Sequence, residues 1–223
     1  MKKILFMTLC FLSIFLMFST TANAAKGYQG YAVYRDGVSS IGFNYEWHAG
    51  LMDEPSTSYF LPVMHIGGKT LPNGTVLYVN WVPYAAVDDN TETFMYKTSN
   101  SFKGLYRPIE NITSAKRDLV VATARNLKNQ NIPFKKVAFE IPINHNSTST
   151  YITYDKITAI RCDGVTEYSY EWNNVKMYGG DNWDISHNTN AVRTAHGALT
   201  PKIQTFSSYA VKLLDNPPTG TYK

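Results

Sequence analysis

The chain has 223 residues and a formal net charge of +4 at neutral pH, from 21 basic and 17 acidic side chains. It contains no block of five or six basic residues, so its charge does not indicate a nucleic-acid-binding protein. The length is sufficient for one domain with a full hydrophobic core.

The first 24 residues have the parts of a secretion signal. Two lysines precede the apolar run 4–18, which is followed by Ala22-Asn23-Ala24, the small-x-small pattern that signal peptidases cleave. The apolar run is shorter than the roughly 20 residues needed to span a bilayer. We therefore expect cleavage after Ala24, a secreted or cell-envelope protein, and a single mature domain over residues 25–223.

Four strands are predicted in the N-terminal part of that domain, because apolar, aromatic and β-branched residues recur between turn signals. They cover residues 28–35, 47–52, 60–66 and 75–82. Short turns such as Asn73-Gly74 separate them, which favours an antiparallel sheet.

The second half mixes helix and strand patterns. Residues 113–129 and 163–172 have helical periodicity, and Thr113 or Ser114 is a suitable cap for the first helix. Residues 134–141 predict a further strand, residues 145–150 a polar loop, and residues 179–223 a loop-rich tail. We expect a single α+β domain with an antiparallel sheet packed against helices.

Cys162 is the candidate nucleophile. The only other cysteine, Cys10, lies in the signal, so the mature protein cannot form an internal disulfide. Free N–H groups at the start of the second helix favour a thiolate, and Arg161 adds positive charge, whereas Asp163 opposes it. We therefore expect a thiol pKa below that of free cysteine. An inert buried cysteine is the alternative.

Two histidines on neighbouring predicted strands are candidates to assist this thiol. His48 is the candidate base, and His65 the candidate that orients the ring of His48. Asn80, on the next strand, competes with His65 for the orienting role. The histidines at 145, 187 and 196 lie in loop-like sequence and receive no role. No metal or other cofactor is expected; a zinc site is the less favoured alternative, since two histidines and one thiol would need a fourth ligand or a water.

Three segments together resemble a known superfamily. Cys162-Asp163-Gly164-Val165 with Tyr168 is similar to the cysteine motif of the NlpC-type papain-like cell-wall peptidases, and Trp47-His48-Ala49-Gly50-Leu51 to their histidine strand. Val63-Met64-His65 resembles the following strand, which often carries the third polar residue. The histidine precedes the cysteine, as in the circularly permuted branch that includes the lecithin:retinol acyltransferase group.

This resemblance implies a papain-like fold and a secreted cysteine hydrolase with Cys162, His48 and His65 as its catalytic residues. The implied substrate is an amide bond in a cell-wall peptide of peptidoglycan. Two alternatives remain open: an acyltransferase or lipid acyl hydrolase of the same fold, and a non-catalytic protein that binds the cell surface.

Overall fold

The structure is a computed structural model of the chain. It describes residues 27–36, 47–53, 62–67, 78–83, 94–95, 102–134, 143–149, 151–177 and 201–216, and in β4 the side chain of Val79 alone. The predicted signal lies outside these ranges. Among the described residues, no helix combines the length and apolar character required to cross a bilayer.

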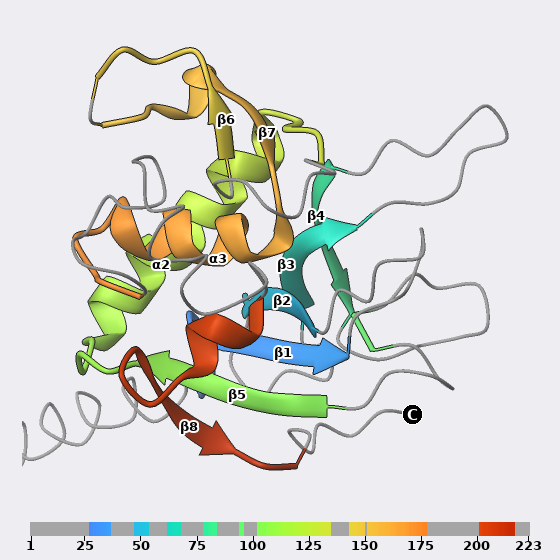
Figure 1. The fold of residues 1–223 in the computed structure, drawn as a ribbon, viewed down its shortest axis with the longest axis vertical. Helices are drawn as coiled ribbons and strands as arrows, with labels where there is room; N and C mark the ends of the chain where they lie inside the picture. Colours follow the sequence, from blue (N-terminus) through green and yellow to red (C-terminus); the bar gives the residue numbers. More distant parts are fainter. Residues whose placement is uncertain are drawn as a thin grey trace, which may run out of the picture.

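Six strands form one antiparallel sheet in the spatial order β4-β3-β2-β1-β5-β8 (Figure 1). Two more strands, β6 and β7, form a separate antiparallel pair at the far end of the molecule from β8. The strands are β1 (Ala32–Asp36), β2 (Trp47–Met52), β3 (Pro62–Gly67), β4 (Tyr78–Pro83), β5 (Phe102–Pro108), β6 (Ile143–His145), β7 (Ile157–Ile160) and β8 (Ala210–Leu214).

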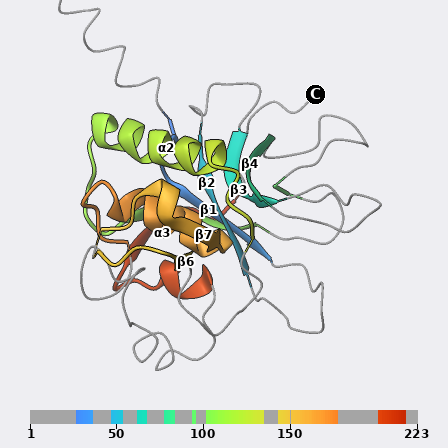
Figure 2. The same cartoon turned by 90° about the horizontal axis from the view of Figure 1, so that it is seen from above.

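Two α-helices, α2 (Ser114–Asn129) and α3 (Cys162–Glu171), lie against each other and against the sheet (Figure 2). Two short 3-10 helices, η1 (Tyr154–Lys156) and η2 (Pro201–Thr205), precede β7 and β8. The larger core cluster joins both helices to one face of the sheet, through side chains such as Leu51, Val120 and Val165. The other face carries a smaller cluster that includes Val33, Met52 and Phe94. The expected α+β class, with an antiparallel sheet and helices, is confirmed.

The predicted elements with the strongest patterns are confirmed. Strand β2 has the bounds expected from the sequence. Helix α2 begins after Thr113, whose side chain accepts a hydrogen bond from the backbone N–H of Lys116. Helix α3 begins at Cys162, one residue before the expected start. Caps and periodic apolar residues are local signals, and this is why they could be read directly from the sequence.

Other expectations need correction. Strands β5, β7 and β8 were not predicted, and β8 lies in the supposedly loop-rich tail, where it pairs with β5 at the sheet edge. His145 ends strand β6 instead of beginning a loop. Of the strand expected at 134–141, Phe134 forms a single bridge to Ile160, and residues 135–141 lie outside the described ranges. Strands β6, β7 and β8 are short, and β5 pairs with β1 and β8, which are distant in sequence, so the alternation of apolar residues alone did not reveal them.

Candidate functional site

The two candidate histidines are brought together as predicted. Strands β2 and β3 are neighbours in the sheet, and Nε2 of His48 lies 2.9 Å from Nδ1 of His65. The rings meet edge to face, with centroids 5.2 Å apart. His65 is buried and His48 is partly buried. A short ring-to-ring hydrogen bond of this kind fixes the orientation of both imidazoles.

Phe94 and Arg35 complete a cluster around this pair, and the sequence analysis did not identify either. The Phe94 ring lies 5.5 Å from the His48 ring and 5.7 Å from the His65 ring, measured between centroids. The Arg35 guanidinium lies over the same phenyl ring, 5.2 Å from its centroid. Arg35 is directly opposite His48 in the β1–β2 register, so a cross-strand pairing argument could have found it.

Gly50 provides the space for Phe94. Residues 48, 50 and 52 share one face of β2, since side chains alternate along a strand. A Cβ atom at Gly50 would lie 2.8 Å from Cε2 of Phe94 and 2.4 Å from Cγ1 of Val63. The glycine at position 50, two residues after His48, is therefore required by close packing on the histidine face.

The Cys162 thiol reaches the sheet from the other face. It is the first residue of α3, and that helix packs on the core face of β2 and β3. Its thiol accepts hydrogen bonds from the backbone N–H groups of Ala49 and Asp163. Ala49 directly follows His48, so the structure places Cys162 beside the backbone of the histidine strand.

The sheet is open at this point. In the described part of the chain, β2 pairs with β3 only at Leu51 and Met52. The N–H of Met52 donates to Tyr31 on the β1 side, and N–H groups alternate in direction along a strand. The N–H of Ala49 therefore points toward β3, where no strand partner for it is described. The Cys162 thiol accepts its hydrogen bond in place of a β3 carbonyl. No hydrogen bond joins Cys162 to His48 within the described ranges. The Cys162 thiol lies on the face of β2 that carries Ala49 and Leu51, and the His48 ring lies on the opposite face, against Phe94.

The expected low thiol pKa is wrong for this structure. Burial, followed by the Asp163 carboxylate, raises the pKa of the Cys162 thiol to about 11. The N–H bond from Ala49 and the charge of Arg161 lower it by less. Arg161 is paired with Asp163 through two bonds, Nε to Oδ1 at 3.0 Å and Nη2 to Oδ2 at 2.6 Å. The pair is buried, so the positive charge expected to favour the thiolate is largely neutralised by its partner.

Both histidines are neutral at physiological pH. Burial, followed by the Arg35 charge, lowers the pKa of His65 to about 3. The same two causes, with a smaller effect from His65, hold the pKa of His48 well below its usual value. The thiol and the histidines therefore rest as uncharged groups.

No protein-family model, curated protein or solved structure matches this chain. The resemblance to the NlpC-type superfamily accordingly rests on the sequence motifs alone.

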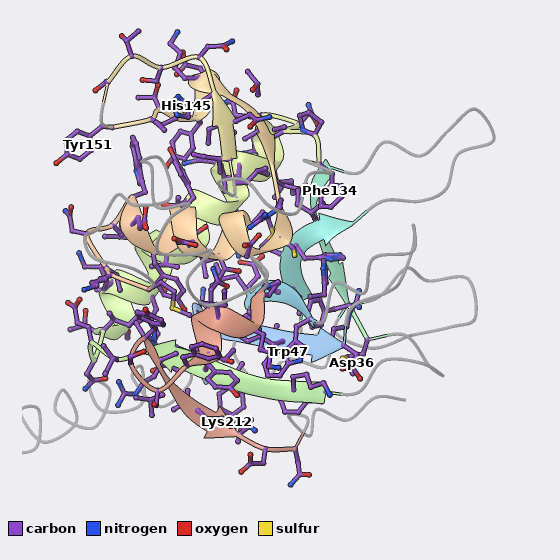
Figure 3. All side chains as sticks on the ribbon, in the orientation of Figure 1. Asp36, Trp47, Phe134, His145, Tyr151 and Lys212 are labelled. Atoms are coloured by element: carbon purple, nitrogen blue, oxygen red, sulfur yellow. The ribbon has the colours of Figure 1, made fainter. Side chains whose placement is uncertain are left out.

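Of Asn80 and the remaining histidines, the structure describes the side chain of His145 alone. The backbone of Asn80 lies opposite His65 in the β3–β4 register, but its side chain is outside the described part. His145 lies on the β6–β7 pair, far from Trp47 at the start of β2 (Figure 3). His187 and His196 are outside the described residues. Within the described ranges, no group of three histidine, cysteine or acidic side chains could hold a metal ion.

Proposed function

We propose that the protein is a secreted cysteine hydrolase of permuted NlpC-type papain-like fold, which cleaves an amide bond in a cell-wall peptide. The observation that carries this proposal is the arrangement at β2. Cys162, in the first turn of α3, lies against the Ala49 backbone, while the preceding residue, His48, has a ring held by His65 at 2.9 Å. A thiol at a helix start and an imidazole oriented by a second histidine are the groups that nucleophilic thiol chemistry requires. They lie on opposite faces of β2, so the proposed proton transfer requires the His48 ring to turn toward the thiol through the opening between β2 and β3.

The tautomers follow from the histidine hydrogen bond. His65 is neutral, so its Nδ1 can accept a proton from Nε2 of His48. Nδ1 of His48 then has a free lone pair, and it is the nitrogen assigned as the base. When His48 takes up a proton, His65 still accepts from Nε2–H and stabilises the imidazolium without moving a proton itself.

The proposed reaction has two stages. In the first, Sγ of Cys162 attacks the carbonyl carbon, its proton passes to Nδ1 of His48, and then to the leaving amine as the C–N bond breaks. In the second, His48 removes a proton from water, which attacks the thioester, and the thiol is restored as the C–S bond breaks. Because both groups begin neutral, His48 acts as a general base during attack. Free N–H groups in the first turn of α3 are suited to hold the oxyanion.

The test is to incubate residues 25–223 with peptidoglycan fragments and, separately, with phospholipid vesicles. Mass spectrometry should detect new peptide termini, and none with Cys162→Ala or His48→Ala. The variant Ser207→Ala, at an exposed position, serves as a matched control. Release of fatty acid without peptide cleavage would contradict the amide substrate and favour the acyltransferase or lipid hydrolase. An unchanged rate with Cys162→Ala would contradict the mechanism.

A non-catalytic cell-surface protein is a second candidate, and the protonation states favour it. A thiol with a pKa of about 11 beside histidines of low basicity is poorly prepared for attack. Such a protein should bind insoluble cell wall without releasing fragments, and Cys162→Ala should bind equally well. A sedimentation assay with analysis of the supernatant separates binding from turnover.

Export belongs to the same proposal. The sequence of residues 1–24 directs secretion and is removed after Ala24. Intact-mass measurement of protein recovered from the growth medium should give a chain that begins at Ala25. A mass that includes the apolar run would mean that the protein stays anchored.

A further inference from the structure

The histidine pair has a close neighbour with no role in the proposed proton transfer. Arg35 is 3% exposed, which is unusual for a charged side chain, and it stands directly across from His48 in the sheet. Its Nη1 donates to the carbonyl of Asp36 at 2.7 Å, which fixes the side chain along its own strand.

Arg35 also contacts the ring that touches both histidines. Its guanidinium lies 5.2 Å from the centroid of Phe94, within the range of a cation–π interaction. Phe94 is fully buried, and its ring lies close to the rings of both His48 and His65. Arg35, Phe94 and the two imidazoles therefore form one packed group on the face of the sheet opposite α3.

We propose that Arg35 is a positioning residue of this site, which holds Phe94 against the two histidine rings and places a permanent positive charge beside them. This inference rests on the proposed function, because it assigns a purpose to keeping His48 unprotonated. A guanidinium keeps its charge at every physiological pH, so it opposes a second positive charge nearby. The base form of His48 would then persist in acidic surroundings, where an ordinary imidazole is protonated.

Other charged side chains on β5 and at the start of α3 are paired with an opposite charge, or lie on the face of β2 opposite the histidines. Lys103 on β5 is paired with Asp36 at 2.8 Å and lies over Trp47, whose side chain faces the other side of β2. At the start of α3, Arg161 and Asp163 form their own pair, and Cys162 is a neutral thiol. In the described structure, Arg35 and the partner imidazole are the only groups whose charge acts on the titration of His48.

The test follows the imidazole nitrogens by NMR between pH 4 and 8, with His48→Ala to assign the signals. Arg35→Met keeps an apolar stem but removes the charge, and we expect the midpoint of the His48 titration to rise by about one pH unit. Arg35→Lys should titrate like the wild type, and so should Lys103→Met, which removes a positive charge elsewhere. On the acid side of the pH–rate profile for peptide cleavage, the midpoint should rise in Arg35→Met by the same amount as the midpoint of the His48 titration.

An unchanged midpoint in Arg35→Met would overturn the inference, as would an equal rise in Lys103→Met. Should Arg35→Met fail to fold, Arg35→Gln takes its place with the same expected rise, and a wild-type His48 ring that is protonated at pH 5 also overturns the inference. The titration needs no substrate. If Arg35→Met raises the His48 midpoint as expected but the wild type never cleaves peptidoglycan, the result contradicts the proposed function and leaves the role of Arg35 in place.

Discussion

Cys162 combines a favourable position with an unfavourable electrostatic environment. It begins a helix and receives two backbone N–H bonds, yet burial and Asp163 dominate its pKa. Helix-terminus effects are modest and confined to the first turn, whereas loss of water around a thiolate is a larger cost. Position at a helix start therefore does not guarantee a reactive thiol.

The thiol should react slowly with iodoacetamide near neutral pH. A rise in pKa from 9.0 to about 11 leaves roughly 100-fold less thiolate than an unperturbed cysteine has. The greater nucleophilicity of a more basic thiolate offsets part of this, so we expect a rate about 10-fold below that of N-acetylcysteine. The rate should climb steeply between pH 8 and 10. Mass spectrometry of residues 25–223 provides the measurement, and a rate equal to that of the free thiol at pH 7 would contradict the burial argument.

Gly50 links packing to the site. Gly50→Ala should lower the free energy of unfolding by about 1–3 kcal/mol, because the new methyl group overlaps Val63 and Phe94 on a crowded face. It should also disturb the histidine signals in NMR spectra, since Phe94 contacts both rings. Leu119→Ala, at an exposed position on α2, is the control, and it should leave the histidine signals unchanged. Equal urea midpoints for Gly50→Ala and the wild type would contradict this prediction, because they would mean that Val63 and Phe94 shift to admit the methyl group at no cost in stability.

At the level of elements, α2 is held by both local and tertiary interactions. Thr113 caps its first turn, and the apolar side of the helix packs into the main core through Val120, Ala124 and Leu127. Arg117 donates from Nη1 to the carbonyls of Gly27 and Gln29, so the helix also holds the turn that leads into β1.

Thr113→Ala should destabilise the protein by about 1 kcal/mol, because the N–H of Lys116 loses its acceptor. Thr113→Ser should retain most of the stability, as its hydroxyl can make the same bond. Urea denaturation followed by far-UV circular dichroism measures both variants. If the alanine and serine variants have the same midpoint, the cap contributes nothing to stability.

For the molecule as a whole, the C-terminal segment is part of the core. β8 completes the sheet beside β5, and Gln204 on η2 is buried under α3. Its Oε1 accepts from the hydroxyl of Tyr34 at 3.0 Å. Its Nε2 donates to the carbonyl of Asp163 at 3.0 Å and to the carboxylate of Glu167 at 3.2 Å. One side chain thus ties the last part of the chain to β1 and to the cysteine helix.

Gln204→Ala should reduce the free energy of unfolding by roughly 3 kcal/mol, since it leaves buried groups on Tyr34, Asp163 and Glu167 without this partner. Ser207→Ala, at an exposed position nearby, should have almost no effect. Thermal and urea unfolding of both variants measure the difference. A loss below about 1 kcal/mol for Gln204→Ala would mean that water replaces the amide.

Elements and residue types whose signals are local could be predicted from the sequence. The alternation in β2, the cap of α2, the helix that begins at Cys162 and the pairing of His48 with His65 on neighbouring strands were all predictable. Each depends on residues close in sequence or on the rule that consecutive strands usually pair.

The tertiary structure alone decided the surroundings of those residues. The sequence could not place Arg35 and Phe94 around the histidines, Gln204 beneath α3, or β8 at the sheet edge. It gave the wrong sign for the pKa of Cys162, because the charge of Arg161 is visible in the sequence but its burial and its pairing with Asp163 are not. Protonation depends on exclusion of water and on charges brought together by folding, and these exist only in the assembled core.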